Sequence, residues 1–128
     1  MKLLLDTCTC LWFAIESPEL SSTATRLCLD PDVERFVSAA SVWEIAIKYA
    51  KGRLALNQSP ENFLVRLLDK AAAEVLPIDE LAALHCGKLP PLHGDPFDRM
   101  LVAQSVIHGM TIVTPDPQVT QYAVRTLW

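Results

Sequence analysis

The chain has 128 residues, of which 51% are hydrophobic and 20% are charged, and its formal net charge is −4. This composition excludes an extended disordered chain and predicts a single domain over residues 1–128, with a core that needs neither a disulfide nor a metal to hold it together. The negative charge argues against a protein that coats DNA. It allows an enzyme in which bound cations meet phosphate groups.

The N-terminal segment does not have the pattern of a targeting or membrane segment. Its apolar residues are interrupted at Asp6, and Glu16 closes the apolar stretch that follows. A secretory signal needs an unbroken apolar segment before a cleavage site, and a membrane span needs about 20 apolar residues. We therefore expect a cytoplasmic protein without membrane contacts. The cysteines lack zinc-ligand spacing and are expected to be reduced and to pack as small apolar groups. They are Cys8, Cys10, Cys28 and Cys86.

Strand and helix patterns alternate along the chain. In chain order, the expected elements are a strand at 2–5, helices at 7–17 and from Ser21 or Ser22 to Leu29, a strand at 35–39, helices at 42–51 and from 60 through 68, a strand at 74–78, helices at 80–87 and 95–108, and strands at 110–113 and 124–127. Ser41 is expected to cap the helix at 42–51, which ends before Gly52. The alternation predicts an α/β fold of three layers around a parallel sheet of four to five strands.

Four acidic side chains are expected to meet at one edge of this sheet. Asp6 directly follows the first strand, and Asp116 lies just beyond the fourth. Glu44 lies in the first turn of the helix after the second strand, and Asp98 in the first turn of the helix before the fourth. Ligands of open parallel sheets bind beyond the carboxyl ends of the strands. The sequence therefore predicts a site at that edge.

Each carboxylate, taken alone, also has an ordinary structural explanation. Asp6 can cap a helix, Asp98 can complement a helix dipole, and Asp116 can be a turn residue. Glu44 can pair with Lys48 four residues later. The structural explanation is weakest for Glu44. Its neighbours make the helix apolar almost all round and therefore largely buried, and a buried carboxylate without a partner is costly. Gathering the carboxylates is also costly, since two of them about 5 Å apart repel by about 3 kcal/mol without a cation.

The donor chemistry indicates which cation would neutralise such a cluster. Carboxylate oxygens are hard ligands and favour Mg²⁺, or Mn²⁺ as a substitute, over zinc. Sites of this kind clamp a phosphodiester and position water for attack on it. In this interpretation Asp6, Glu44 and Asp98 hold the metal directly or through water. Asp116 then completes the site or orients a second ion.

Neighbouring hydroxyl and basic side chains each allow two interpretations. Thr7 and Thr114 either hydrogen-bond to the carboxylates or the attacking water, or they cap helices. Arg99 either pairs with a carboxylate or contacts the substrate. The densest basic patch either contacts RNA phosphates or complements a helix C-terminus. This patch consists of Lys48, Lys51 and Arg53. The histidines share no metal-ligand spacing, so none is assigned as a general base; they are His85, His93 and His108.

Four segments of the chain together resemble PIN-domain ribonuclease toxins of the VapC type. These segments are Leu3–Thr7 with Leu11 and Trp12, Ser41–Lys48 with Gly52 and Leu54, His93–Gln104, and Thr114–Asp116 with Tyr122 beyond. The resemblance spans nearly the whole chain in the right order. It implies a PIN fold, metal-dependent endoribonuclease activity on RNA, and the role of the toxin in a toxin–antitoxin pair.

The resemblance also assigns residues and partners. It places the acidic quartet of the family on Asp6, Glu44, Asp98 and Asp116, and Asp95 then caps a helix. It implies a homodimer and a cognate antitoxin whose C-terminal segment lies in a groove near the active site. Apolar residues that either line this groove or belong to the core are Leu11, Trp12, Leu27 and Phe63.

Other functional classes fit the sequence less well. A phosphatase that used Asp6 as its nucleophile would carry a second acid two residues later, where this chain has Cys8. A response-regulator receiver would need an acidic pair that is missing here. The remaining alternative is a PIN-like module that binds RNA or protein without catalysis.

Overall fold

The computed structural model describes residues 1–128 and shows a five-stranded sheet in the order β3-β2-β1-β4-β5. All of the paired strands are parallel. The strands are β1 at Lys2–Leu5, β2 at Glu34–Ser38, β3 at Ala73–Leu76, β4 at Thr111–Val113 and β5 at Thr126–Leu127. Strand β1 is central: β2 and β3 follow one another outward on one side of it, and β4 and β5 on the other side.

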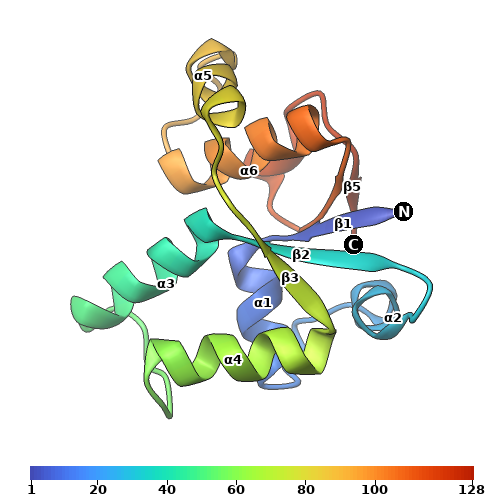
Figure 1. Ribbon diagram of the computed structural model, residues 1–128, viewed down its shortest axis with the longest axis vertical. Helices are drawn as coiled ribbons and strands as arrows, with labels where there is room; N and C mark the ends of the chain where they lie inside the picture. The colour runs from blue at the N-terminus through green and yellow to red at the C-terminus, as the bar shows by residue number, and fades with distance from the viewer.

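Helices cover both faces of the sheet, as Figure 1 shows. In that view α5 and α6 lie above the sheet, and α1, α2 and α4 lie below it. The helices are α1 at Thr7–Ala14, α2 at Ser22–Leu29, α3 at Ala39–Ala50, α4 at Pro60–Ala71, α5 at Glu80–Lys88, α6 at Pro96–His108 and α7 at Pro117–Thr120. The predicted three-layer α/β/α class with a parallel sheet is confirmed.

The central strand explains how the core is divided between the two faces. Leu3, Leu4 and Leu5 of β1 are all fully buried. Because successive side chains of a strand point to opposite faces, Leu3 and Leu5 join the core under α1, α2, α3 and α4, whereas Leu4 packs against Leu101 of α6. This burial on both faces fixes the position of the carboxyl end of β1, and therefore of Asp6.

The start of α3 differs from the prediction. Ser38, and not Ser41, caps this helix, with the Ser38 hydroxyl accepting a hydrogen bond from the Ala40 N–H at 3.0 Å. Ser41 instead lies inside the first turn, where its hydroxyl accepts a hydrogen bond from Thr7 Oγ1 at 2.9 Å. Its hydroxyl is therefore committed to a long-range contact, and the nearby Ser38 supplies the cap.

The expectation that this largely apolar helix, α3, is mostly buried is also wrong. Trp43 is 58% exposed, whereas Glu44, one position later, is only 5% exposed. Neighbouring helix residues point about 100° apart, so the helix presents Trp43 outward and Glu44 inward. The Glu44 carboxylate therefore lies on the buried side of the helix.

Other helix ends follow the sequence signals. Ser21 caps α2, and Asp95 caps α6 by accepting hydrogen bonds from the N–H groups of Phe97 and Asp98. The short helix α7 was not predicted; it begins at Pro117 directly after its cap, Asp116. Gly109 closes α6 with φ +64°, a left-handed conformation that suits glycine.

Arg35 of β2 is an unpredicted buried cation. Its guanidinium donates hydrogen bonds to the backbone carbonyls of Ala71, Leu27 and Asp30. It therefore ties the C-terminal ends of α4 and α2 to β2.

The four cysteines are free thiols, and Cys10 and Cys28 are buried. Burial raises the pKa of the Cys28 thiol to about 11, so it stays protonated inside the core. No helix in the structure is both long and apolar enough to span a bilayer.

Candidate active site

A cavity of about 230 Å³ at the carboxyl edge of the sheet brings the four predicted acids together. Asp6 reaches it from the end of β1, Glu44 from α3, Asp98 from the first turn of α6, and Asp116 from the start of α7. The cavity is also lined by Thr7, Cys8, Leu11, Lys48 and Asp95. The structure thus places side chains that are far apart in sequence around one polar hollow.

Asp6 is held by hydrogen bonds to both of its oxygens. Oδ1 accepts from the Cys8 N–H at 2.7 Å, and Oδ2 accepts from the Thr114 hydroxyl. Burial raises the pKa of the Asp6 carboxyl above its usual 3.8, although the hydrogen bonds from Thr114 and Cys8 act in the opposite direction. The carboxylate is therefore oriented firmly, in a place where a bare negative charge is unfavourable.

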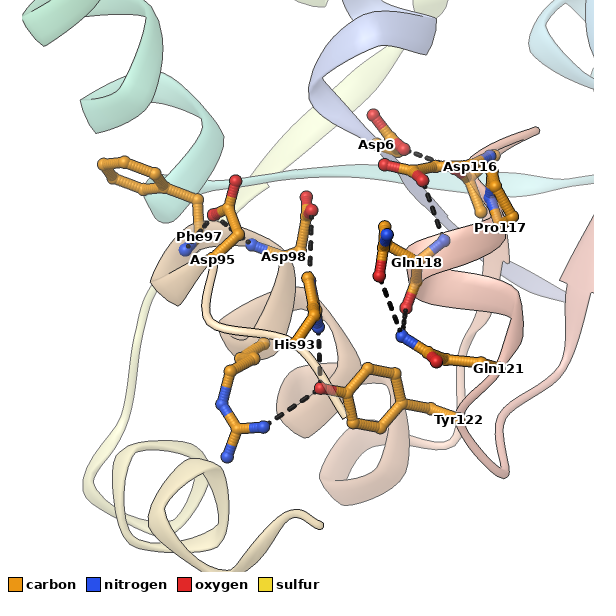
Figure 2. Close-up of polar contacts among 12 residues, drawn as sticks. Asp6, His93, Asp95, Phe97, Asp98, Asp116, Pro117, Gln118, Gln121 and Tyr122 are labelled. Atoms are coloured by element: carbon orange, nitrogen blue, oxygen red, sulfur yellow. Dashed lines mark hydrogen bonds and ion pairs between the residues drawn. The ribbon is translucent and has the colours of Figure 1, made fainter. Parts of the chain in front are cut away.

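Thr114 links Asp6 to Asp116. While its hydroxyl donates to Asp6, the hydroxyl oxygen accepts from the Asp116 N–H at 3.1 Å. Asp116 caps α7, with Oδ1 accepting from the Gln118 N–H at 2.9 Å. Figure 2 shows the Asp116 carboxylate beside Asp6. Of the two interpretations of Thr114, the hydrogen bond to a carboxylate is the one observed.

Thr7 does not share this role. It lies buried in the first turn of α1, and its hydroxyl donates to Ser41 and not to a carboxylate. Thr7 therefore joins α1 to α3 in the wall of the cavity.

Asp98 lies where its charged form is disfavoured. Its pKa is raised from 3.8 to about 6, first by burial and then by the charges of Asp95 and Asp6. The imidazole of His93 lies 3.4 Å from Asp98 Oδ2 and lowers the pKa. His93 was not predicted as part of the site, because the spacing of the histidines does not indicate metal ligands and its contact is with a carboxylate five residues away.

Glu44 and Lys48 form the expected pair, with Lys48 Nζ 2.5 Å from Glu44 Oε2. The pair is not on a fully solvated face. The Glu44 carboxylate is buried, whereas the Lys48 side chain is about half exposed, and both line the cavity. The hydrogen bond that Lys48 donates to Glu44 raises the pKa of the Lys48 ammonium. Lys51 and Arg53, the rest of the basic patch, are exposed and do not line the cavity.

Of the two interpretations of Arg99, pairing with a carboxylate is not observed. Its guanidinium donates to the backbone carbonyls of Pro90, Cys86 and Leu89, and to the hydroxyl of Tyr122 at 3.0 Å. Although Arg99 follows Asp98 in sequence, consecutive helix residues do not share a face. Arg99 holds the connection between α5 and α6 instead of facing the cavity.

The donor set fits a hydrated hard cation better than a fully enclosed one. No group of three or more His, Cys, Asp or Glu side chains is close enough to hold a metal ion by itself. Mg²⁺ keeps several waters and commonly binds through only one or two carboxylates. Burial is the main cause of the raised pKa values of Asp6 and Asp98, and the charges of neighbouring carboxylates add to it. The residues therefore fit Mg²⁺ or Mn²⁺ coordinated partly through water.

Together these features define a parallel α/β/α protein with a carboxylate-lined cavity at the carboxyl edge of its sheet. The family model of the PIN domain matches residues 3–125. The chain therefore belongs to the PIN-domain family. No curated protein matches it by sequence.

Solved structures share this fold over nearly the whole chain. VapBC2 from Rickettsia felis, bound to a DNA fragment from their promoter, matches with a TM-score of 0.75 and 14% identity, covering 99% of this chain and 98% of that chain. DNA-bound VapBC from Salmonella typhimurium matches with a TM-score of 0.70 and 22% identity, over 99% and 97%. FitAcB from Neisseria gonorrhoeae matches with a TM-score of 0.69 and 22% identity, over 98% and 96%.

Proposed function

We propose that this protein is a Mg²⁺- or Mn²⁺-dependent endoribonuclease that cuts RNA in the cytoplasm as the VapC-type toxin of a toxin–antitoxin pair. The observation that carries the proposal is the gathering of Asp6, Glu44, Asp98 and Asp116 around one cavity of a PIN domain. Like charges gathered in this way are destabilising unless a cation is bound, and this cost indicates selection for chemistry and not for stability.

The proposed roles follow from how each side chain is held. When bound, the metal ion supplies positive charge for the phosphate and acidifies a water molecule. Asp6 is oriented by Thr114 and the Cys8 N–H, and Asp98 is approached by His93. Asp116 keeps one oxygen on the Gln118 N–H, so its other oxygen remains for the cavity. These carboxylates, with Glu44, would hold the ion and its waters.

Basic residues near the cavity supply the contacts to the RNA backbone in this proposal. Lys48 lines the cavity, and Lys51 and Arg53 are exposed just beyond the end of α3. Contacts of this type would add affinity without choosing a sequence. They would also counter the repulsion between the acidic cavity and an approaching phosphate.

The antitoxin part of the proposal is supported by an apolar hollow close to the site. A cavity of about 140 Å³ between α3 and α4 is lined by Val42, Ala46, Pro60 and Leu64 among others. Of the four residues expected either to line a groove or to belong to the core, Leu27 and Phe63 are buried in the core, and Phe63 also lines this hollow. We propose that an apolar antitoxin segment occupies this hollow, and that a basic side chain of the same segment reaches the carboxylates.

A second copy of the chain is proposed to cover α5. Leu81 and Leu84, three residues apart on this helix, are both mostly exposed, and Val106 of the neighbouring α6 is 45% exposed. Exposed apolar side chains gathered in this way commonly mark an interaction site. Sedimentation of the purified protein would test the proposed homodimer.

The experiment that tests the nuclease is cleavage of a mixed RNA panel with Mg²⁺, Mn²⁺ or EDTA, comparing wild type with Asp98→Asn. Asp32→Asn is a matched control, because Asp32 is an exposed acid in a turn far from the cavity. We expect metal-dependent cutting by wild type and control, and none by Asp98→Asn. A folded wild type that binds RNA without cutting it, in every metal, would favour the non-catalytic binding module.

A further inference from the structure

A chain of hydrogen bonds connects Arg99 to Asp98 through the side chains of Tyr122 and His93. Arg99 Nη1 lies 3.0 Å from the Tyr122 hydroxyl, and this hydroxyl lies 2.8 Å from His93 Nδ1. The other ring nitrogen of His93, Nε2, lies 3.4 Å from Asp98 Oδ2. Figure 2 shows His93 between Tyr122 and Asp98. The chain joins α6, the loop before it, and the segment after α7.

The chemistry of the groups fixes the direction of these hydrogen bonds. A guanidinium only donates, so the Tyr122 oxygen accepts from Arg99. The Tyr122 O–H has no acceptor in the structure other than His93 Nδ1. A neutral imidazole whose Nδ1 accepts must carry its proton on Nε2. That proton faces Asp98, whereas the opposite tautomer would direct a lone pair at a carboxylate and leave the Tyr122 O–H without an acceptor.

Burial makes this arrangement stiff. The His93 side chain is 11% exposed, and its ring packs against Tyr122 with the centroids 5.4 Å apart in an edge-to-face arrangement. Arg99 is fixed in turn by the carbonyls of Pro90, Cys86 and Leu89. The whole network is thus anchored on backbone, and it ends on a carboxylate of the cavity.

We propose that His93 is a positioning residue for Asp98, and that Tyr122 and Arg99 hold it in the tautomer that donates from Nε2. Its part in catalysis rests on the proposed nuclease function. The tautomer does not, because it follows from the resting arrangement of the side chains. The distance of 3.4 Å is long, as hydrogen bonds of unliganded active sites often are, and the contact tightens when the site is filled. His93 itself does not touch the substrate.

The tautomer is tested by ¹⁵N NMR of the imidazole rings of the metal-free protein, at a pH about two units above the usual imidazole pKa. His93→Gln identifies the signals of His93 by their loss. We expect the Nε2–H tautomer in wild type. In Tyr122→Phe, which keeps the ring but removes the hydroxyl, we expect a mixture of tautomers. An Nδ1–H tautomer in wild type, or no change in Tyr122→Phe, would overturn the proposal.

The positioning role is tested by steady-state cleavage kinetics of His93→Ala and His93→Gln. Loss of a side chain that orients a ligand of a metal site typically costs roughly 10- to 100-fold in activity, and we expect His93→Ala to lose this much in kcat with little change in KM for RNA. His93→Gln, which retains an N–H donor, should recover part of the loss. Equal losses in the two variants, or a loss confined to KM, would contradict a positioning role.

Thermal unfolding of each variant shows whether the loss reflects folding. Tyr122→Phe is a second control for folding, because it removes only the hydroxyl and keeps the aromatic rings at positions 93 and 122 packed together. If wild type does not cleave RNA at all, the proposed nuclease function fails. The NMR result then still decides whether His93 is held toward Asp98 as described.

Discussion

Replacing Asp98 with asparagine should stabilise the fold while it removes activity. The rise in the pKa of Asp98 from 3.8 to about 6 corresponds to at most about 3 kcal/mol of unfavourable free energy for the charged form. Its side chain is 17% exposed, so water screens part of this cost. We therefore expect the variant to gain about 1–2 kcal/mol near neutral pH.

The sign of the pH dependence follows from proton uptake. Between about pH 4 and 6 the folded protein holds a proton on Asp98 that the unfolded chain has already released. The contribution of Asp98 to stability therefore falls as the pH rises through this range, and its full cost is present above pH 6. Asp98→Asn lacks this cost, so its advantage over wild type should disappear near pH 4.

Thermal unfolding by circular dichroism, with EDTA present, measures the effect across this pH range. For a domain of this size the gain corresponds to roughly 3–7 °C in Tm near neutral pH. Asp32→Asn should not reproduce it, because Asp32 is exposed and its side chain makes no hydrogen bond. Added Mg²⁺ should then raise the Tm of wild type more than that of Asp98→Asn. A variant less stable than wild type at neutral pH, or a gain equally large near pH 4, would refute the electrostatic reasoning.

Three further substitutions test single contacts. Thr114→Val removes the hydroxyl between Asp6 and Asp116, and should cost about 1–3 kcal/mol in urea unfolding and reduce RNA cleavage. Arg35→Met leaves three carbonyls without their donor, and should lower the free energy of unfolding by about 2–4 kcal/mol without changing activity per folded molecule. Gly109→Ala places a side chain at φ +64°, and a Tm unchanged from wild type would contradict the expected loss of about 1–2 kcal/mol.

The parts of the fold that could be predicted depend on local pattern. The apolar run at Leu3–Leu5 ends at an acid, and the periodicity of the helices follows directly from sequence. Because parallel strands place their carboxyl ends at one edge, the meeting of Asp6 with Asp116 could be predicted as well. The structure has these carboxylates around one cavity.

The contacts that could not be predicted depend on which way a side chain points. Arg99 follows Asp98 in sequence, but the helix turns it toward the α5–α6 connection. The pair of Trp43 and Glu44 shows the same effect, with one side chain outside and the other inside. His93 meets Tyr122 only because the loop before α6 and the segment after α7 come together. A single sequence carries no local signal for such a contact.

The structural and functional explanations of the acidic residues are compatible, because a carboxylate has two oxygens. Asp6, Asp95 and Asp116 cap α1, α6 and α7 respectively. In Asp95 and Asp116 the backbone N–H groups occupy Oδ1 alone, and Oδ2 accepts no hydrogen bond. The helix N-termini also carry partial positive charge that offsets the repulsion within the cluster, so the chain can fold before any cation binds.

Because Asp116 both caps a helix and carries a charge, only a substitution that keeps the cap can isolate the effect of the charge. Asparagine caps a helix about as well as aspartate does, but it lacks the negative charge that attracts a cation. Asp116→Asn should therefore preserve α7 and its hydrogen bond to Gln118 while weakening the affinity of the cavity for Mg²⁺. Alanine would remove the cap and the charge together, and its effect could not be divided between them. A variant with asparagine that unfolds would show that the charge of Asp116, and not its capping oxygen, holds this end of the sheet.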